Sequence, residues 1–455
     1  MAISGVSSQD SYDVIVIGAG FAGLSAAVRC ATRGARVLVV EARSRLGGRA
    51  TAFPDRETGE LVDNGQHVLL GCYTDTLAFL RDIGASDHVT VQAQLTVTMI
   101  DRQGRRSRLS CPAYLPPPLH LLAGLFEWDA LDWRDRFSAI NMATPIKLAR
   151  RELLPGAKRK AASTGETVES FLIRNGQTGR LREMLWNPLA LAALNQPPDR
   201  ASAPPFARVL GEMFGSDPRA AAIVLPVKPL HVMYAEPARR YVESRGGTVR
   251  MGSAAKVRVN GGVSLAVVAD GHQWSAKSVI SAVPWYAIAE LFDAVPAALK
   301  DLVDRARKMD SCPIVTVNLW FNRRIIDEPF IGLPGRVMQW VFDKGLVFGD
   351  EASHLSLVSS GADAMMSRTN DELIQLAQQE LYEAIPDVRT ATLLRATVIR
   401  EPRATFSLAS GQPERPGTET GVRGFYLAGD WIDTGLPATI ESAVRSGNRA
   451  ADLSA

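Results

Sequence analysis

The sequence predicts an α/β protein in which a doubly wound, largely parallel sheet is assembled from separate parts of the chain and interrupted by inserted α+β segments. Three observations lead to this prediction. Near the start, a β-branched run over 12–17 is followed by a helical pattern over 21–33 and a second strand pattern over 36–40. The length of 455 residues is more than one core usually needs. Further strand patterns lie far downstream, at 247–259, 264–269, 278–283 and 424–428.

These positions divide the chain into two expected units. Residues 1–75, 223–290 and 406–455 would form the nucleotide-binding domain, because the strand patterns of the parallel sheet fall there. Residues 76–222 and 291–405 would form an inserted substrate-binding domain with lid segments. The opening ten residues precede the first strand pattern and lack a basic start followed by an apolar run, so we expect a loose tail rather than a signal peptide.

Composition excludes several classes of partner. The chain has 51 Lys and Arg against 48 Asp and Glu, a balance too even for a nucleic-acid surface, although a weak bias toward anionic lipid stays open. The four cysteines have no short paired spacing, so we expect no disulfide framework, no metal site and a reducing compartment. The prediction is a cytoplasmic protein, with peripheral attachment to the inner face of the cell membrane left open.

A glycine-rich turn joins the first strand pattern to the following helix. Gly18, Gly20 and Gly23 of the GAGFAG segment stand after a strand and at the start of a helix, which is the context of a dinucleotide-binding fingerprint. Gly18 permits the tight turn, Gly20 lets backbone approach a pyrophosphate, and Gly23 allows the helix to pack close to the sheet. Phosphate would then lie at the helix N-terminus. A Rossmann-type domain is therefore expected.

An acidic residue ends the second strand pattern. Glu41 stands 18 residues beyond Gly23, where a carboxylate can accept hydrogen bonds from both ribose hydroxyls of an adenosine. This position favours FAD or NAD over NADP.

Two further segments indicate a flavin. In RLGGRAT at 45–51, the paired glycines bring backbone N–H groups toward the pyrophosphate while Arg49 supplies charge-assisted hydrogen bonds. GFYLAGD at 424–430 is a strand pattern that leads into a Gly-Asp pair. Both segments resemble signatures of the flavin amine oxidases and phytoene desaturases. The resemblance implies FAD, an amine-oxidase-like fold, and a contact of Asp430 with a ribityl hydroxyl or the pyrophosphate.

A final helix is expected to begin at Pro437 with its N-terminus toward the flavin. The positive end of the helix dipole would stabilise negative charge on a reduced isoalloxazine. We also expect Gly65, Val257, Thr439 and Ile440 to contact the cofactor.

Two features that the sequence lacks indicate how the flavin is attached and how it is reduced. No cysteine lies near Asp430 in the sequence, so FAD should be bound without a covalent link. Only one dinucleotide fingerprint is present, so a built-in nicotinamide domain is not expected. The external electron donor for the flavin is not identified by the sequence.

Three internal segments narrow the resemblance. DNGQHVLLG at 63–71, LWNPLALAALN at 185–195 and LPVKPL at 225–230 resemble the squalene-associated FAD-dependent desaturases, also called hydroxysqualene dehydroxylases. The resemblance runs from about residue 12 to residue 451. It implies bacterial squalene or hopanoid synthesis, an isoprenoid lipid substrate, and removal of the allylic hydroxyl of hydroxysqualene by reduced flavin.

The chemistry implied by this resemblance needs an acid and an apolar cavity. His67 is the candidate acid, since imidazole can donate a proton near neutral pH, and Asp63 could orient it. The alternatives are a histidine that only hydrogen-bonds flavin or backbone, and a turn-capping or cofactor-binding aspartate. Residues available to exclude water from a cationic intermediate are Trp186, Leu189, Leu194, Trp285 and Trp340.

Three other functions stay open. A carotenoid or polyprenoid desaturase would use the same motifs in the oxidative direction, a flavin amine oxidase is a weaker alternative, and a non-enzymatic lipid carrier stabilised by flavin is the third. The apolar stretch 111–131 is interpreted either as a buried helix after a proline turn or as a segment that contacts a membrane surface.

Overall fold

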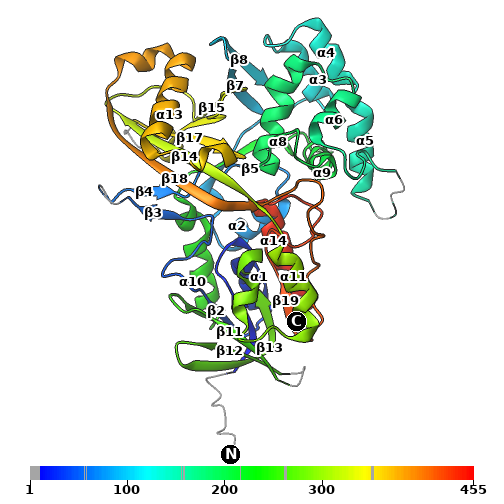
Figure 1. Ribbon diagram of the computed structural model, residues 1–455, viewed down its shortest axis with the longest axis vertical. Coiled ribbons are helices and arrows are strands. Elements are labelled where there is room, and N and C mark those ends of the chain that lie inside the picture. Colours follow the sequence, from blue (N-terminus) through cyan, green and yellow to red (C-terminus); the bar gives the residue numbers. More distant parts are fainter. Residues whose placement is uncertain are drawn as a thin grey trace, which may run out of the picture.

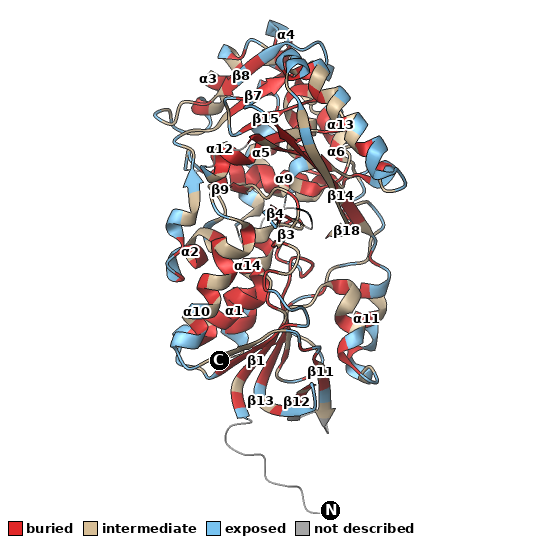
Figure 2. Ribbon diagram, turned by 90° about the vertical axis from the view of Figure 1, so that its left-hand side faces the viewer, coloured by how far each residue is buried: buried red, intermediate tan, exposed pale blue. Residues whose placement is uncertain are grey.

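The computed structural model describes residues 11–55, 57, 59–154, 156, 159–215, 217–260, 264–349 and 353–454. The tail expected over the first ten residues lies outside these ranges. The molecule is elongated, with one large sheet near each end (Figure 1). Figure 2 shows that strands of both sheets are buried along much of their length.

The first large sheet is the predicted doubly wound sheet. Its order is β10-β2-β1-β13-β12-β11, and β19 pairs with β13. β10, β2, β1, β13 and β19 pair in parallel, whereas β12 and β11 extend the sheet antiparallel. β2 is fully buried, as expected for a parallel strand covered on both faces. The strands are Ser11–Ile17 (β1), Val37–Val40 (β2), Thr248–Arg250 (β10), Lys256–Asn260 (β11), Ser264–Ala269 (β12), His272–Ser281 (β13) and Phe425–Leu427 (β19).

Helices cover both sides of this sheet. Phe21–Thr32 (α1) packs against both Glu236–Ser244 (α10) and Ile440–Leu453 (α14), and Lys300–Arg307 (α11) lies on the opposite side (Figure 2). α1 and α14 approach closely at Gly447, where a Cβ atom would lie 2.2 Å from a backbone oxygen of α1.

The start of α14 differs from the prediction. The helix begins at Ile440 rather than at Pro437. Thr439 is extended, and its hydroxyl accepts a hydrogen bond from the Ser442 N–H at 3.1 Å. A threonine cap therefore sets the helix start, and the proline lies in the preceding loop.

The second large sheet has the order β18-β14-β17-β16-β15-β7-β8. Its pairings are antiparallel except between β15 and β7. Asn370–Ala384 (α13) packs on one face over a separate apolar core, and Lys344–Phe348 (α12) follows β16. The strands are Thr96–Ile100 (β7), Arg106–Ser110 (β8), Ser311–Phe321 (β14), Phe330–Gly332 (β15), Trp340–Asp343 (β16), Ser353–Ser360 (β17) and Leu393–Phe406 (β18).

A group of helices lies beside the second sheet (Figure 1). It consists of Leu119–Glu127 (α3), Trp133–Ile140 (α4), Ala143–Glu152 (α5), Val168–Arg174 (α6), Gly179–Leu181 (α7), Asn187–Leu194 (α8) and Ala203–Met213 (α9). Thr74–Asp82 (α2) packs against α14. Short 3-10 or π-helical turns occur at Ser86–His88, Arg182–Trp186, His231–Ala235, Trp285–Leu291, Ala297–Leu299, Asp363–Met365 and Pro386–Thr390.

Two small sheets connect the large units. Ala52–Pro54 (β3) pairs with Leu61–Asp63 (β4). Leu69–Leu70 (β5) and Val89–Val91 (β6) flank Ile223–Pro226 (β9). β4 and β5 thus fix both ends of the segment that carries His67.

The apolar stretch 111–131 is partly core. Cys111, Leu125, Trp128 and Leu131 are buried, whereas Tyr114 and Leu119 are exposed. Within the described ranges, no helix has the length and apolar character needed to span a bilayer.

Candidate functional site

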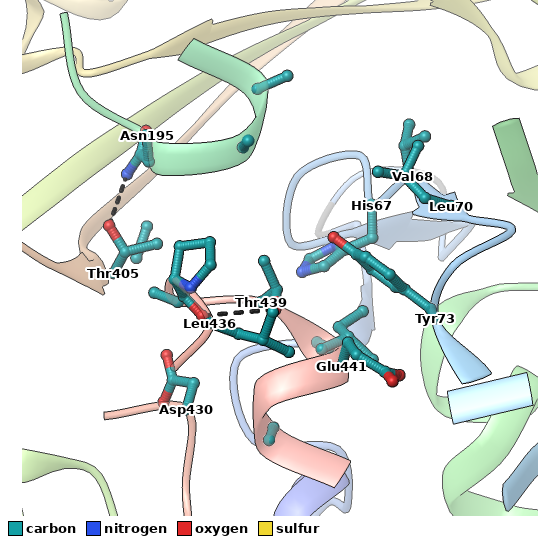
Figure 3. Close-up of a pocket in the computed structure, with 18 of the residues that line it drawn as sticks. His67, Val68, Leu70, Tyr73, Asn195, Thr405, Asp430, Leu436, Thr439 and Glu441 are labelled. Carbon is teal, nitrogen blue, oxygen red and sulfur yellow. Dashed lines mark hydrogen bonds between the residues drawn. The ribbon is translucent and has the colours of Figure 1, made fainter. Parts of the chain in front are cut away.

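A cavity of about 990 Å³ runs from the glycine-rich turn after β1 into the helical group. At one end its wall is backbone and charged side chains of the first sheet, and at the other it is almost wholly apolar. Figure 3 shows part of the wall, with Asp430 and Thr439 of the first unit opposite Asn195 and Thr405 of the second. The cavity can therefore hold a polar cofactor and an apolar substrate in contact.

The glycines of the first turn lie as their positions require. A Cβ atom on Gly23 would lie 1.9 Å from the carbonyl oxygen of Gly18, so only glycine lets α1 pack this close. Gly18 has φ +102°, which favours glycine. Gly20 lines the cavity, and its nearest neighbour to a Cβ would be Gly48 at 3.9 Å. The space beside Gly20 is open on the cavity side, where a diphosphate can approach the start of α1.

Glu41 organises the same turn. Its carboxylate accepts hydrogen bonds from the N–H groups of Ala19 at 2.7 Å and Arg43 at 2.9 Å, and the residue is 7 % exposed. Glu41 lines the cavity, so its remaining lone pairs are available to the ribose of a nucleotide bound there.

Arg49 and Asp430 come from opposite ends of the chain and form an ion pair in the cavity wall. The Arg49 guanidinium also donates to the carbonyl oxygen of Ala404 at 2.8 Å. This pairing fixes the glycine-doublet loop against β19 and β18. The charged pair is buried on the Asp430 side, where it can also bind polar groups of a cofactor.

Thr439 and Ile440 line the cavity at the start of α14, and the N-terminus of that helix faces into it (Figure 3). Val257 does not line it: its side chain is buried in the core, and the wall beside β11 is formed by 254–256. A side-chain contact between Val257 and the cofactor is therefore not part of the observed cavity.

The two candidate catalytic residues, Asp63 and His67, have different surroundings. Gly65 and His67 line the cavity, but Asp63 is not part of the lining. The Asp63 carboxylate instead forms a buried ion pair with Lys344 at 2.7 Å and accepts a hydrogen bond from the Leu230 N–H at 3.0 Å. Asp63 therefore anchors the segment and has no direct hydrogen bond to His67 among the contacts that the structure describes.

His67 is held in one tautomer. Its Nδ1 lies 3.3 Å from the carbonyl oxygen of Gly65, which can only accept, so Nδ1 carries the proton. Desolvation lowers the pKa of His67, although the Asp63 charge opposes the shift. The imidazole is therefore neutral near pH 7, with Nε2 as an acceptor. Donation of a proton by Nε2 requires prior protonation of the ring.

Tyr73 and Cys72 are among the cavity residues that were not predicted. Tyr73 lies beside His67 (Figure 3), and burial raises the pKa of its phenol, so it stays protonated and can donate. Cys72 also lines the cavity, and burial raises the pKa of its thiol to about 12. The only sequence signal for either residue was its place shortly after His67.

The distal part of the cavity has an apolar wall. Trp186, Leu189 and Trp340 line it, as the sequence suggested, whereas Leu194 and Trp285 are buried elsewhere. Asn195 connects the wall to the second sheet, because its side chain donates to Thr405 Oγ1 at 3.0 Å and accepts from the Gly361 N–H at 2.8 Å. Other lining residues include Leu95, Val97, Leu121, Leu125, Ile146, Leu185, Val209, Phe330 and Phe342.

Comparison with known proteins agrees with this arrangement. The model of the flavin-containing amine oxidoreductase family matches residues 21–453, and the chain belongs to this family. FAD is the cofactor, and the protein is an FAD-dependent oxidoreductase with an amine-oxidase-like fold.

Individual relatives and one solved structure show what the chain is similar to within this family and fold. A hydroxysqualene dehydroxylase from Rhodopseudomonas palustris (strain ATCC BAA-98 / CGA009) is 30% identical over 97% of this chain and 98% of its own. The 15-cis-phytoene desaturase of Solanum lycopersicum is 25% identical over 96% of this chain and 76% of its own. The crystal structure of an oxidoreductase from Methanosarcina mazei has a TM-score of 0.75 at 18% identity, covering 97% and 100% of the chains.

The residues present fit FAD. The open space beside Gly20 suits the diphosphate, Glu41 suits the adenosine ribose, and Arg49 with Asp430 suits the ribityl chain. The start of α14 can stabilise negative charge on the isoalloxazine. No cluster of three or more metal-ligating side chains is found within the described part of the chain.

Proposed function

We propose that this protein removes the allylic hydroxyl group of hydroxysqualene to give squalene, as part of squalene or hopanoid synthesis. The C–O bond breaks, the hydroxyl takes a proton and leaves as water, and a hydride forms the new C–H bond. Reduced FAD, when bound, supplies that hydride. An external two-electron donor must then reduce the flavin again.

The observation that carries this proposal is the cavity itself: its apolar part continues directly from the wall that contains Glu41, Arg49 and Asp430. A charged or small polar amine would lose its hydration there without compensation, whereas a long isoprenoid chain gains by leaving water. Residues such as Leu189, Phe330 and Trp340 exclude water that would otherwise recapture an allylic cation. The similarity to hydroxysqualene dehydroxylases over nearly the full length supports the same substrate class.

His67 and Tyr73 are the proposed sources of the proton. Both line the cavity close to the start of α14. Tyr73 is protonated at neutral pH and can donate directly, whereas His67 can donate only after protonation. Asp63 is proposed to position the His67 segment through Lys344 rather than to act on the substrate.

The test is anaerobic and uses the photoreduced holoprotein. On mixing with hydroxysqualene, flavin absorbance should return to the oxidised spectrum while one squalene forms per flavin. Reduced protein that does not react with hydroxysqualene would contradict the proposal.

A desaturase acting on a carotenoid precursor is the second candidate, supported by the 25% identity to phytoene desaturases. This candidate predicts the opposite result. Phytoene should bleach the flavin absorbance of the oxidised holoprotein, and the reduced protein should not react with hydroxysqualene. The two measurements together separate the two directions of hydride transfer.

A further inference from the structure

We propose that the outer ends of α3, α4 and α5 form a membrane-docking face around the mouth of the cavity, through which an isoprenoid passes directly between an anionic bilayer and the flavin site. This inference rests on the proposed isoprenoid substrate. Figure 1 places these helices at the end of the molecule remote from the first sheet.

The mouth is defined by residues that both line the cavity and are exposed. Pro118 precedes α3, Ile140 ends α4 and Ala143 begins α5, and all three have this double character. Further in, Leu121 and Ile146 continue the same wall. The apolar cavity therefore reaches the surface between α3 and the junction of α4 with α5.

Large apolar side chains surround this mouth on the outside. Trp133 is 62% exposed and Phe137 is 58% exposed, and the two rings form one cluster with Phe126 at centroid distances of 6.0 to 6.3 Å. Leu119 is also exposed. Aromatic and aliphatic side chains held together in water are unfavourable, and they are typical of surfaces that enter a lipid interface.

The charge of the same face selects the partner. From residue 143 to residue 160, along α5 and the segment after it, there are six basic residues and one acidic one, whereas the exposed Glu127, Asp129 and Asp132 precede α4. Arg159 and Lys160, at the end of that segment, are exposed. The whole chain has a net charge of only +3, so positive charge is concentrated on α5 and on the segment that follows it. Basic residues beside an apolar cluster match the headgroups of anionic lipid, each contributing about fivefold to binding.

Lys147, Arg150 and Arg151 are the exposed cations of α5, and Arg136 stacks on the Trp133 ring at 4.9 Å. In this proposal α5 supplies the headgroup contacts and the aromatic cluster of α4 enters the lipid interface. The sequence placed the possible membrane contact at 111–131, part of which is buried, whereas this proposal places it at α4 and α5.

The experiment is flotation of the full-length, flavin-loaded protein with vesicles of phosphatidylcholine alone or with phosphatidylglycerol added. The wild type should float with the anionic vesicles, less with the neutral ones, and less as salt rises. Trp133→Ser/Phe137→Ser and, separately, Arg150→Glu/Arg151→Glu should each lower the vesicle affinity at least tenfold with flavin content unchanged.

Matched controls lie elsewhere on the surface. Ile173→Ser/Leu394→Ser removes two exposed apolar residues, and Arg307→Glu/Lys308→Glu reverses two exposed charges on and after α11. Both controls should float as the wild type does. The proposal is overturned if the wild type does not float, if the α4 and α5 variants float like the controls, or if this face instead mediates a concentration-dependent dimer. No substrate is present, so failure here leaves the reaction test unaffected.

Discussion

Gly20 and Gly23 have similar sequence contexts but different surroundings. A side chain on Gly20 meets no atom closer than 3.9 Å, whereas one on Gly23 would overlap the Gly18 carbonyl. Gly20→Val should therefore fold and lose FAD, because the side chain occupies the diphosphate space. Gly23→Val should lose the fold itself. Circular dichroism and flavin absorbance measure the two effects, and full flavin occupancy in Gly20→Val would show that the diphosphate lies elsewhere.

His67 and Tyr73 make different predictions for the pH dependence of turnover. If the His67 imidazolium is the acid, kcat/KM should rise as pH falls through its lowered pKa, because the ring is neutral near pH 7. His67→Gln should then abolish this rise while flavin content stays normal. If the Tyr73 phenol is the acid, kcat/KM should be flat from about pH 5 to 8 and Tyr73→Phe should lose turnover.

The sequence anticipated the residues of the cavity wall beside the glycine-rich turn better than it anticipated the candidate proton donors. Gly18, Gly20 and Glu41 belong to a motif whose spacing predicts a nucleotide contact, whereas Asp430 was expected from a family resemblance, and all four line the cavity. Tyr73 belongs to no such motif. Its position in the cavity depends on β5 pairing with β9, which lies far away in the sequence.

At the scale of elements, the buried ion pair between Asp63 at the end of β4 and Lys344 at the start of α12 joins the two units. Lys344→Met leaves a buried carboxylate without its cation, which should cost about 3–5 kcal/mol. We expect a lower thermal midpoint and weaker FAD retention, because the adjoining Gly65–His67 segment lines the cavity.

Asp63→Asn/Lys344→Met is the control for this pair. It removes both charges and keeps an acceptor for the Leu230 N–H, so stability should recover in part. Equal stability and flavin content in the wild type and Lys344→Met would show that the pair anchors nothing.

A second cross-strand group links β14, β17 and β18. His354 stacks on Trp320 at 4.1 Å, Arg395 lies over the same ring at 4.3 Å, and His354 Nε2 donates to Asn318 Oδ1 at 2.9 Å. Burial lowers the pKa of His354 from 6.5 to about 3. The folded state therefore binds fewer protons than the unfolded state below pH 6.5, and stability falls as pH decreases toward 3.

Because of His354, the free energy of unfolding should be about 2 kcal/mol lower at pH 5 than at neutral pH. His354→Gln can still donate to Asn318 but does not titrate. The urea midpoint of the variant should therefore change less between pH 7.5 and pH 5 than that of the wild type. An identical change in both proteins would assign the acid sensitivity to other groups.

The elements themselves were predicted where local pattern is strong. β1, α1 and β2 follow their sequence signals within a residue, since each is an apolar run with a clear end: Gly18 follows β1, Gly34 closes α1 and Glu41 follows β2. The start of α14 was misplaced, because proline at the first turn and threonine at the cap are both common helix starts and only the hydrogen bond to Ser442 distinguishes them.

At the scale of the whole molecule, the cavity determines how the flavin is retained. Cys72 is a cavity cysteine that the sequence did not place there, but the pKa of its thiol is raised to about 12, so it is protonated and a poor nucleophile. We therefore predict that acid or heat releases intact FAD. Cys72→Ala should have the same flavin content, and flavin that stays with the denatured chain would contradict the prediction.

The sequence assigned strand patterns that lie far apart along the chain to one sheet, and they do share it, but the pairing of individual strands was not predicted. β19 pairs with β13 and β7 with β15 through contacts that no local pattern specifies. The predicted domain limits stay a prediction.

The parallel sheet has a consequence for the order of biosynthesis. Its first strands are made early, but β19 and the cap of α14 leave the ribosome only after nearly all the intervening chain. The nascent N-terminal part therefore exposes an apolar sheet edge and an incomplete nucleotide site throughout translation. Flavin can be captured firmly only after the last of these strands has joined, so cellular FAD supply should act on the finished polypeptide, and a shortage should leave it open to proteolysis.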